Sequence, residues 1–276
     1  MIAQGIARSR GSGAMIAEAA RVSPEWLLLR EPADAAARSA ELADRLGRQL
    51  AVAGRLVIHD LGGGSGAMGR WLAPRLPGPQ HWVLHDRDAD LLALAVANPP
   101  GAAVSFEARR SDITCLARGD LAGASLITAS ALLDLLTRDE LRRLLGAGAG
   151  RPMLLALTVV GRVTMTPEEP LDALMGAAFD AHQRRGRRLG PDAVVAAARE
   201  LRRTGAEVLV RPSPWRLDAA HADLAAEWLG GWVGAACEQE PALAAEAFAY
   251  RDRRLAQAAA GELVVTVDHA DLLVLP

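Results

Sequence analysis

Lysine is absent from this chain of 276 residues, so arginine supplies its basic side chains apart from six histidines. Without lysine the protein has neither a Schiff-base lysine nor a phosphate-binding loop that ends in Gly-Lys-Ser/Thr. Cysteine is scarce too, because Cys115 and Cys237 stand far apart with no histidine at ligand spacing. That scarcity argues against a disulfide framework and a zinc site. We therefore expect no bound metal and a cytoplasmic location.

Strong charge and long apolar runs are missing as well. The formal net charge is −2, with acidic and basic residues well mixed, which argues against wrapping nucleic acid or binding an anionic membrane. No apolar stretch approaches the length of a membrane span, and the first residues lack the apolar core of a signal peptide. Because 51% of the residues are hydrophobic, we expect a globular protein with a sizeable core. We also expect that it binds neither nucleic acid nor a membrane.

Short apolar strands alternate with helices over most of the chain. The sequence predicts strands at 56–61, 81–86, 103–107, 124–130, 153–160, 206–211 and near the C-terminus, and helices at 67–76, 89–97, from Thr137 with a Thr137/Glu140 capping box, and at 191–204. Such alternation is typical of an α/β fold with a parallel sheet covered by helices on both faces.

Helical additions are expected around this pattern. Residues 1–50 are predicted to form an N-terminal tail followed by helices, and residues 51–276 a single domain. Within that domain we expect helical inserts at about 166–190 and 217–258. The residues that follow the strand at 206–211, with Trp215 among them, are expected to be helical.

Two glycine patterns overlap directly after the first strand. Residues 64–69 fit the dinucleotide pattern G-x-G-x-x-G, and residues 60–66, read Asp-Leu-Gly-Gly-Gly-Ser-Gly, fit D-x-G-x-G-x-G. Both describe a buried strand that turns sharply into a helix, where glycine permits positive φ and the close approach of a ligand. The two patterns point to different cofactors.

Charge at Asp60 separates the two cofactors. A dinucleotide places its pyrophosphate over the glycine turn, at the positive end of the following helix, and a carboxylate there would oppose it. S-adenosylmethionine brings a protonated amine and a sulfonium without phosphate, so Asp60 favours it. Asp86, at the end of the second strand, suits the ribose hydroxyls of either cofactor. After the third strand, Asp112 is placed to accept from an adenine amino group and Ile113 to cover the ring.

With these residues and the segment "TASALLD" (128–134) after the fourth strand, the chain resembles the class I S-adenosylmethionine-dependent methyltransferases. The resemblance implies a Rossmann-like, seven-stranded, mostly parallel sheet with an antiparallel last strand, extra N-terminal helices and helical insertions. It also implies that a methyl group passes from S-adenosylmethionine to a small molecule, at an O, N or C nucleophile, by in-line displacement. The cofactor-binding residues that it implies are Asp60, Gly62, Gly64, Gly66, Asp86, Asp112, Ile113 and Ser130.

The acceptor side carries weaker signals. Family members that methylate amines of bases or glutamine have an N-P-P-Y-like motif where this chain reads Ser130 to Asp134, which disfavours nucleic-acid amines as substrates. Asp134 and Trp215 are candidate substrate contacts, although a helix-start carboxylate and a buried indole explain them as well. His182 is the candidate catalytic base, but it shares an apolar helical face that also suits a packed histidine. The arginine run at 184–188 fits an anionic substrate or a solvated turn.

Two other functions stay open. An NAD(P)-dependent oxidoreductase on the same fold would use Gly64, Gly66 and Gly69, but Asp60 counts against it. A non-catalytic cofactor-binding protein would keep the glycine turn and lack a productive acceptor pocket, and the sequence contains no diagnostic base that excludes it.

Overall fold

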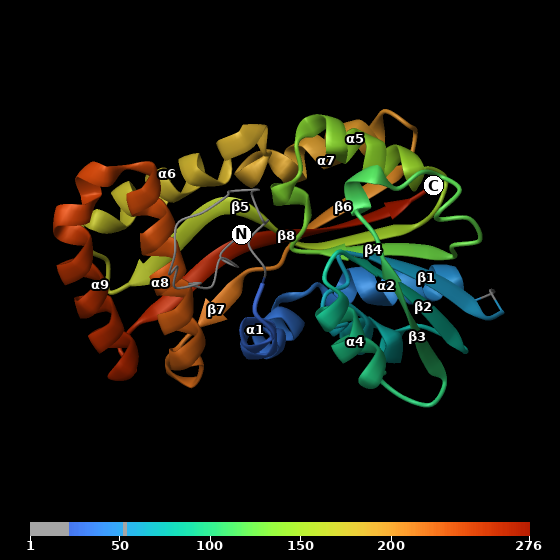
Figure 1. Ribbon diagram of the computed structural model, residues 1–276, viewed down its shortest axis with the longest axis horizontal. Helices are drawn as coiled ribbons and strands as arrows, with labels where there is room; N and C mark the ends of the chain where they lie inside the picture. Colours follow the sequence, from blue (N-terminus) through green and yellow to red (C-terminus); the bar gives the residue numbers. More distant parts are fainter. Residues whose placement is uncertain (1–21, 52–53) are drawn as a thin grey trace, which may run out of the picture. The chain divides into compact units, whose positions relative to one another are not determined.

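A computed structural model describes residues 22–51 and 54–276, so the tail expected over residues 1 to about 20 lies outside the described residues. Figure 1 shows the elements along the chain. The helices are α1 (Pro24–Ala37), α2 (Ala40–Leu50), α3 (Ala67–Leu72), α4 (Ala89–Ala97), α5 (Arg138–Ala147), α6 (Leu171–Gln183), α7 (Ala193–Arg202), α8 (Ala222–Gln239) and α9 (Ala244–Ala259). The strands are β1 (Leu56–Leu61), β2 (Gln80–Asp86), β3 (Val104–Arg110), β4 (Leu126–Ser130), β5 (Met153–Thr166), β6 (Glu207–Pro212), β7 (Trp215–Leu217) and β8 (Val264–Leu275).

The strands form one mixed sheet in the order β3-β2-β1-β4-β5-β8-β6, with β7 pairing to β8 beside this path. β1 pairs in parallel with β2 and β4, β2 with β3, and β4 with β5, whereas β6 and β8 are antiparallel. In this register Asp60 lies between Leu84 of β2 and Thr128 of β4. The predicted mostly parallel sheet with an antiparallel last strand is confirmed, and its carboxyl edge is where ligands of such sheets bind.

The sheet departs from the expected pattern in its C-terminal part. Over residues 22–51 and 54–276 it has eight strands instead of seven, because the three-residue strand β7 is added. Trp215 opens that strand, so the prediction that a helical region contains it is wrong. The proline pair at 212 and 214 explains the error, since a residue before proline favours extended backbone. β5 also continues to Thr166, six residues beyond its expected end.

The chain folds into two compact units. The first comprises the described residues up to Ala33, Val163–His182 and Arg216–Thr266, and the second comprises Asp34–Arg162, Gln183–Trp215 and Val267–Pro276. The division predicted from the sequence, into residues 1–50 and 51–276, stays a prediction. No helix in the described part of the chain is long and apolar enough to cross a membrane.

Helices cover both faces of the sheet in the second unit. α5 and α7 pack on one face, and α2, α3 and α4 on the other, and Figure 1 shows α5 and α7 above the strands and α4 below them. Leucine at helical spacing supplies the contacts, and each fully buried leucine contributes about 1.5 to 3 kcal/mol. Helix residues in these cores include Leu42, Leu46, Met68, Leu72, Leu92, Leu141, Leu144, Val194 and Leu201. The predicted capping box between Thr137 and Glu140 fixes the start of α5.

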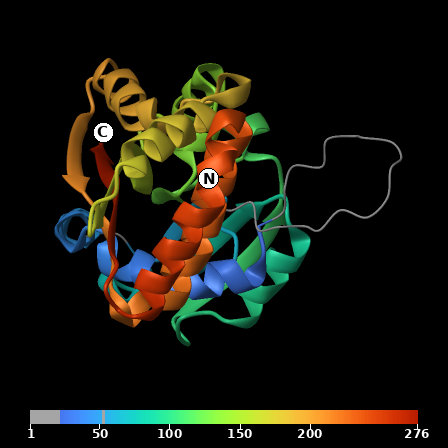
Figure 2. The ribbon, with the colours of Figure 1, turned by 90° about the vertical axis from the view of Figure 1, so that its left-hand side faces the viewer.

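Helices dominate the first unit, where α8 and α9 lie side by side (Figures 1 and 2). The fully buried Arg254 of α9 donates to both carboxylate oxygens of Asp172 at 2.6 Å, and the Tyr250 hydroxyl donates to the same carboxylate at 2.6 Å. The charge of the buried Arg254 must be matched in this way, because its guanidinium has lost its water. This cluster fixes α9 to the start of α6.

A pair of buried histidines links β1 and β2 in the second unit. His59 Nδ1 lies 2.9 Å from His85 Nε2, and His85 Nδ1 lies 3.0 Å from the Ser111 hydroxyl. Burial, together with the positive charge of Arg109, lowers the pKa of each histidine to about 4. Both rings are therefore neutral at pH 7, where one ring can donate to the other.

The histidine pair predicts acid sensitivity. In the unfolded chain each histidine takes up a proton below about pH 6.5, while in the folded protein it resists protonation down to about pH 4. For these two groups the unfolded state thus binds more protons in this window, so their contribution to the free energy of unfolding falls as the pH drops from 6.5 towards 4, by about 2 kcal/mol for each histidine. Urea unfolding across this range is expected to show that His59→Gln loses less stability than the wild type for the same drop in pH. A loss equal to that of the wild type would contradict the assignment, and His221→Gln, at a partly exposed site, is the control.

Candidate functional site

The glycine turn joins β1 to α3 through three residues with positive φ. Gly62, Gly64 and Gly66 have φ values of 70°, 50° and 84°. The amides of Gly62 and Gly63 donate to the carbonyl oxygen of His85 at 2.8 and 3.0 Å, and the Gly66 amide donates to the Gly63 carbonyl at 2.8 Å. The three left-handed positions are the glycines of the pattern over residues 60–66, and side chains other than glycine rarely adopt that conformation.

Asp60 lies beneath this turn with 1% of its surface exposed. Its Oδ1 accepts a hydrogen bond of 2.7 Å from the Thr128 hydroxyl, while Oδ2 has no hydrogen-bond partner among the described residues. A Cβ added at Gly63 would lie 3.3 Å from Oδ2, so the free oxygen faces the turn. Burial raises the pKa of Asp60 to about 7, although the Thr128 bond and the charge of Arg38 lower it. A buried acceptor without a donor is costly, and a cationic ligand would satisfy it.

Arg38 brings a positive charge to the same place. It follows α1, is 4% exposed, and donates from its guanidinium to the Ser130 hydroxyl at 3.1 Å. The guanidinium also lies 5.5 Å from the Trp71 ring centroid and 3.8 Å from Asp34. Sequence reasoning missed Arg38, because a single arginine in an alanine-rich helical segment carries no motif. A buried arginine and a buried carboxylate beside the glycine turn form a site for a ligand with both charges.

Asp86 ties the end of β2 to the glycine turn. Its Oδ2 accepts from the Gly64 amide at 2.9 Å, and its Oδ1 accepts from the Asp88 amide at 3.0 Å. Each carboxylate oxygen has a second lone pair, so the side chain can accept further hydrogen bonds from a ligand. Asp86 therefore orders the turn and stays available to ribose hydroxyls.

Asp112 is more fully engaged than the sequence suggests. Its Oδ1 accepts from the amide and hydroxyl of Thr114 at 2.9 and 2.7 Å, and Oδ2 pairs with Arg87 at 2.7 Å. Burial raises the pKa of Asp112, but Arg87 and Thr114 outweigh it and hold the pKa at about 2. Ile113 is buried in the core cluster beneath α5. An adenine amino group that binds Asp112 would therefore either share the carboxylate with Arg87 or displace Arg87 from it.

The candidate substrate residues lie in different parts of the chain. Asp134 is buried in the short 3-10 turn after β4. Trp215 is 3% exposed and donates from Nε1 to Asp34 at 2.9 Å. His182 belongs to the first unit, and its Nε2 lies 3.2 Å from the Glu238 carboxylate. The second unit thus holds the predicted cofactor residues together with Asp134 and Trp215, while His182 belongs to the first.

Metal ligands are not gathered in the part of the chain that the structure describes. No group of three or more histidine, cysteine, aspartate or glutamate side chains there is arranged to hold a metal ion. Both cysteines, at positions 115 and 237, are free thiols.

Compared with protein-family models and with curated proteins, the chain matches none. It is similar to the solved structure of loganic acid methyltransferase with SAH, at 11% identity and a TM-score of 0.51, covering 90% of this chain and 93% of that one. It is also similar to a SAM-dependent methyltransferase from Geobacter sulfurreducens with S-adenosyl-L-homocysteine (17%, TM-score 0.46, 92% and 98% covered). A third similar structure is the cyclopropane synthase MmaA2 from Mycobacterium tuberculosis (14%, TM-score 0.48, 92% and 95%).

The first of these likenesses establishes the fold. It extends over 90% of this chain, whose sheet is mostly parallel and includes an antiparallel pair of C-terminal strands. This chain therefore has the Rossmann-like fold of the class I S-adenosylmethionine-dependent methyltransferases, as its sequence predicts.

Proposed function

We propose that this protein is an S-adenosylmethionine-dependent methyltransferase that acts on a small molecule. The observation that carries the proposal is the pair of opposite buried charges, Asp60 and Arg38, beside a turn of three left-handed glycines. An amino acid carries an ammonium and a carboxylate on one carbon, and these two side chains complement both. The fold shared with loganic acid methyltransferase supports the same cofactor.

The residues present fit S-adenosylmethionine. The partnerless Oδ2 of Asp60 would accept from its ammonium, and Arg38 with Ser130 would hold its carboxylate. Asp86 would take the ribose hydroxyls, and Asp112 the adenine amino group. The glycines at 62, 64 and 66 supply the left-handed backbone of the turn over which the cofactor would lie. A pyrophosphate in the same place would meet the Asp60 carboxylate, so an oxidoreductase using NAD(P) is disfavoured.

Methyl transfer requires little acid–base chemistry from the protein. When bound, S-adenosylmethionine supplies a methyl group already activated by its sulfonium. The protein must hold the acceptor nucleophile in line at about 3 to 3.5 Å and keep water away, which is worth several kcal/mol. An acidic nucleophile needs a base, for which we propose His182, oriented by Glu238. Asp134 and Trp215 are the proposed contacts to the acceptor. The balanced charge supports a small molecule over nucleic acid.

Ligand-induced stabilisation tests the cofactor. S-adenosylmethionine and S-adenosylhomocysteine at a hundred times their dissociation constants are each expected to stabilise the protein by about 2.7 kcal/mol, measured as a shift in unfolding temperature, while NAD and NADP give none. A shift with NAD or NADP alone would reject the proposal in favour of an oxidoreductase. Binding of the adenosyl ligands without methyl transfer to any acceptor would favour a non-catalytic cofactor-binding protein.

A further inference from the structure

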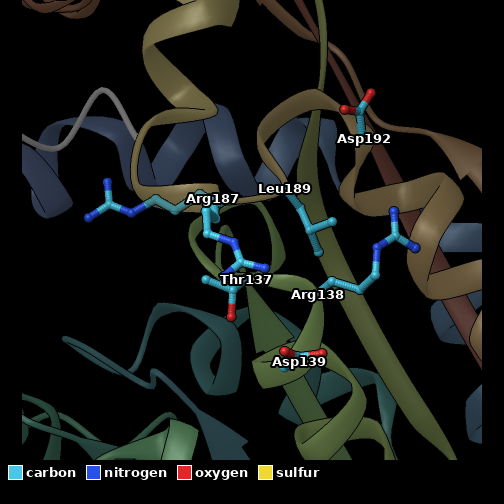
Figure 3. A pocket seen from close by; sticks show the side chains of 7 residues that line it. Thr137, Arg138, Asp139, Arg187, Leu189 and Asp192 are labelled. Atoms are coloured by element: carbon cyan, nitrogen blue, oxygen red, sulfur yellow. The ribbon is translucent and has the colours of Figure 1, made fainter.

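A pocket of about 380 Å³ opens in the second unit, where the start of α5 meets the loop that leads into α7. Arg138, Arg187 and Arg188 line it, together with Asp139 and Asp192 (Figure 3). Its arginines come from two segments that are about fifty residues apart in sequence, so the fold brings them together. None of the functions assigned above uses this pocket.

The pocket is tied to the chain that leaves β4. Thr137 and Arg188 form an isolated antiparallel bridge, and the Leu189 amide donates to the Leu136 carbonyl at 2.8 Å. These backbone contacts place residues 187–189 against the start of α5, and α5 follows the carboxyl end of β4. Ligands of open α/β sheets bind at that edge.

Positive charge prevails in the pocket although two carboxylates line it. Asp192 is paired with Arg184 at 3.1 Å, and Asp139 with Arg142 at 3.6 Å. Neither Arg184 nor Arg142 lines the pocket, and because Arg142 also contacts Glu200 at 3.3 Å it compensates Asp139 only in part. The side chains that line the pocket carry three positive and two negative formal charges, an excess of one positive charge.

Backbone conformation also sets Arg187 apart. Gly186 and Arg187 both have φ of 65°, in the left-handed region that glycine adopts freely and other residues avoid. Glycine at position 187 would relieve the strain, yet the chain carries an arginine there. Strained residues of this kind cluster at ligand sites.

From these observations we infer that this pocket binds an oxyanion, a carboxylate or phosphate, carried by the methyl acceptor. The guanidinium group of arginine matches either anion with paired N–H donors. The identification of the anion with part of the acceptor rests on the proposed function, whereas the anion site itself does not.

Calorimetric titration of the cofactor-free protein with inorganic phosphate and with succinate, at low salt, tests the site. Saturable binding of at least one is expected, and Arg187→Gly is expected to weaken it about tenfold or more. Because glycine suits the backbone at this position, that variant should fold as well as the wild type, so a loss of binding reports the guanidinium. Arg138→Gln is expected to act in the same direction, and Arg199→Gln, on the exposed side of α7, is the matched control.

The outcomes separate the possibilities. Tighter binding of phosphate supports the site with a phosphorylated acceptor, and tighter binding of succinate supports it with a carboxylate acceptor. Failure of both anions to bind, or equal binding by Arg187→Gly, overturns the inference. The titration contains no S-adenosylmethionine, so this failure is distinct from a failure of the cofactor proposal, which the thermal shifts report separately.

Discussion

Replacing Asp60 with asparagine is expected to weaken S-adenosylmethionine binding about 10- to 100-fold while leaving the ligand-free protein at least as stable at pH 8. The binding loss follows from removing one partner of a buried charged contact, which is worth about 1.5 to 3 kcal/mol. The stability effect follows from the raised pKa of Asp60, about 7 against 3.8 for an ordinary aspartate.

The sign of the stability effect comes from proton binding. Between pH 4 and pH 7 the folded protein keeps the Asp60 proton and the unfolded chain has lost it, so the contribution of Asp60 to the free energy of unfolding falls as the pH rises through this window, opposite in sign to that of the buried histidines. At pH 8 the loss is about 4 kcal/mol. Asparagine does not ionise, so it removes this loss of stability. Its N–H₂ group, however, would lie where Oδ2 has no hydrogen-bond partner, and a buried donor without an acceptor costs about 1 to 3 kcal/mol. A net gain of about 1 to 3 kcal/mol remains.

Two measurements check this prediction. Urea unfolding at pH 8 compares the stabilities, with Asp44→Asn on the exposed side of α2 as the control for a lost charge. Titration of S-adenosylmethionine from pH 5.5 to 7.5 should show affinity rising with pH in the wild type, because binding an ammonium expels the Asp60 proton, and no such rise in Asp60→Asn. Equal affinity of variant and wild type would remove Asp60 from the site and with it the charge argument for the cofactor.

Local patterns predicted those elements whose signals lie within a few residues. Strand 56–61 and helix 89–97 have the predicted bounds, because an apolar run ending at a glycine turn and an apolar helix stopped by proline are both local. The fold followed from the order of such elements. The prediction for Trp215 was wrong because its extended conformation comes from pairing with β8, which is distant in sequence.

The sequence could not predict which residues far apart along the chain enclose and contact one another. The motif indicates that Asp60 ends a strand, but its pKa is raised by the neighbours that enclose it and lowered in part by Thr128, 68 residues further on. Arg38 reaches Ser130 across 92 residues, and no spacing rule predicts such a contact. The arginine run at 184–188 fitted a solvated turn equally well, and only the bridge to Thr137 shows that part of it lines a pocket.

Replacing Gly66 with alanine is expected to have the largest effect on stability, a loss of about 3 to 4 kcal/mol together with the loss of S-adenosylmethionine binding. The φ of 84° costs an alanine about 1 to 2 kcal/mol. The new Cβ would also lie 2.9 Å from the Phe106 ring and 3.1 Å from the Ala95 Cβ, and such overpacking costs about 1 to 3 kcal/mol. Against a typical total of 5 to 15 kcal/mol, this is a large fraction.

Two other glycines separate the causes in urea unfolding. Gly123 has φ of 77° with open space around its Cβ position, so Gly123→Ala measures the backbone cost alone. Gly69 has no positive φ, but its Cβ would lie 2.6 Å from the Phe106 ring, so Gly69→Ala measures the clash alone. The loss in Gly66→Ala should approach the sum of the two, because the same ring blocks both sites. A loss no larger than that of Gly123→Ala would mean that Phe106 moves aside freely, and the glycine at position 66 would then be required by its backbone conformation alone.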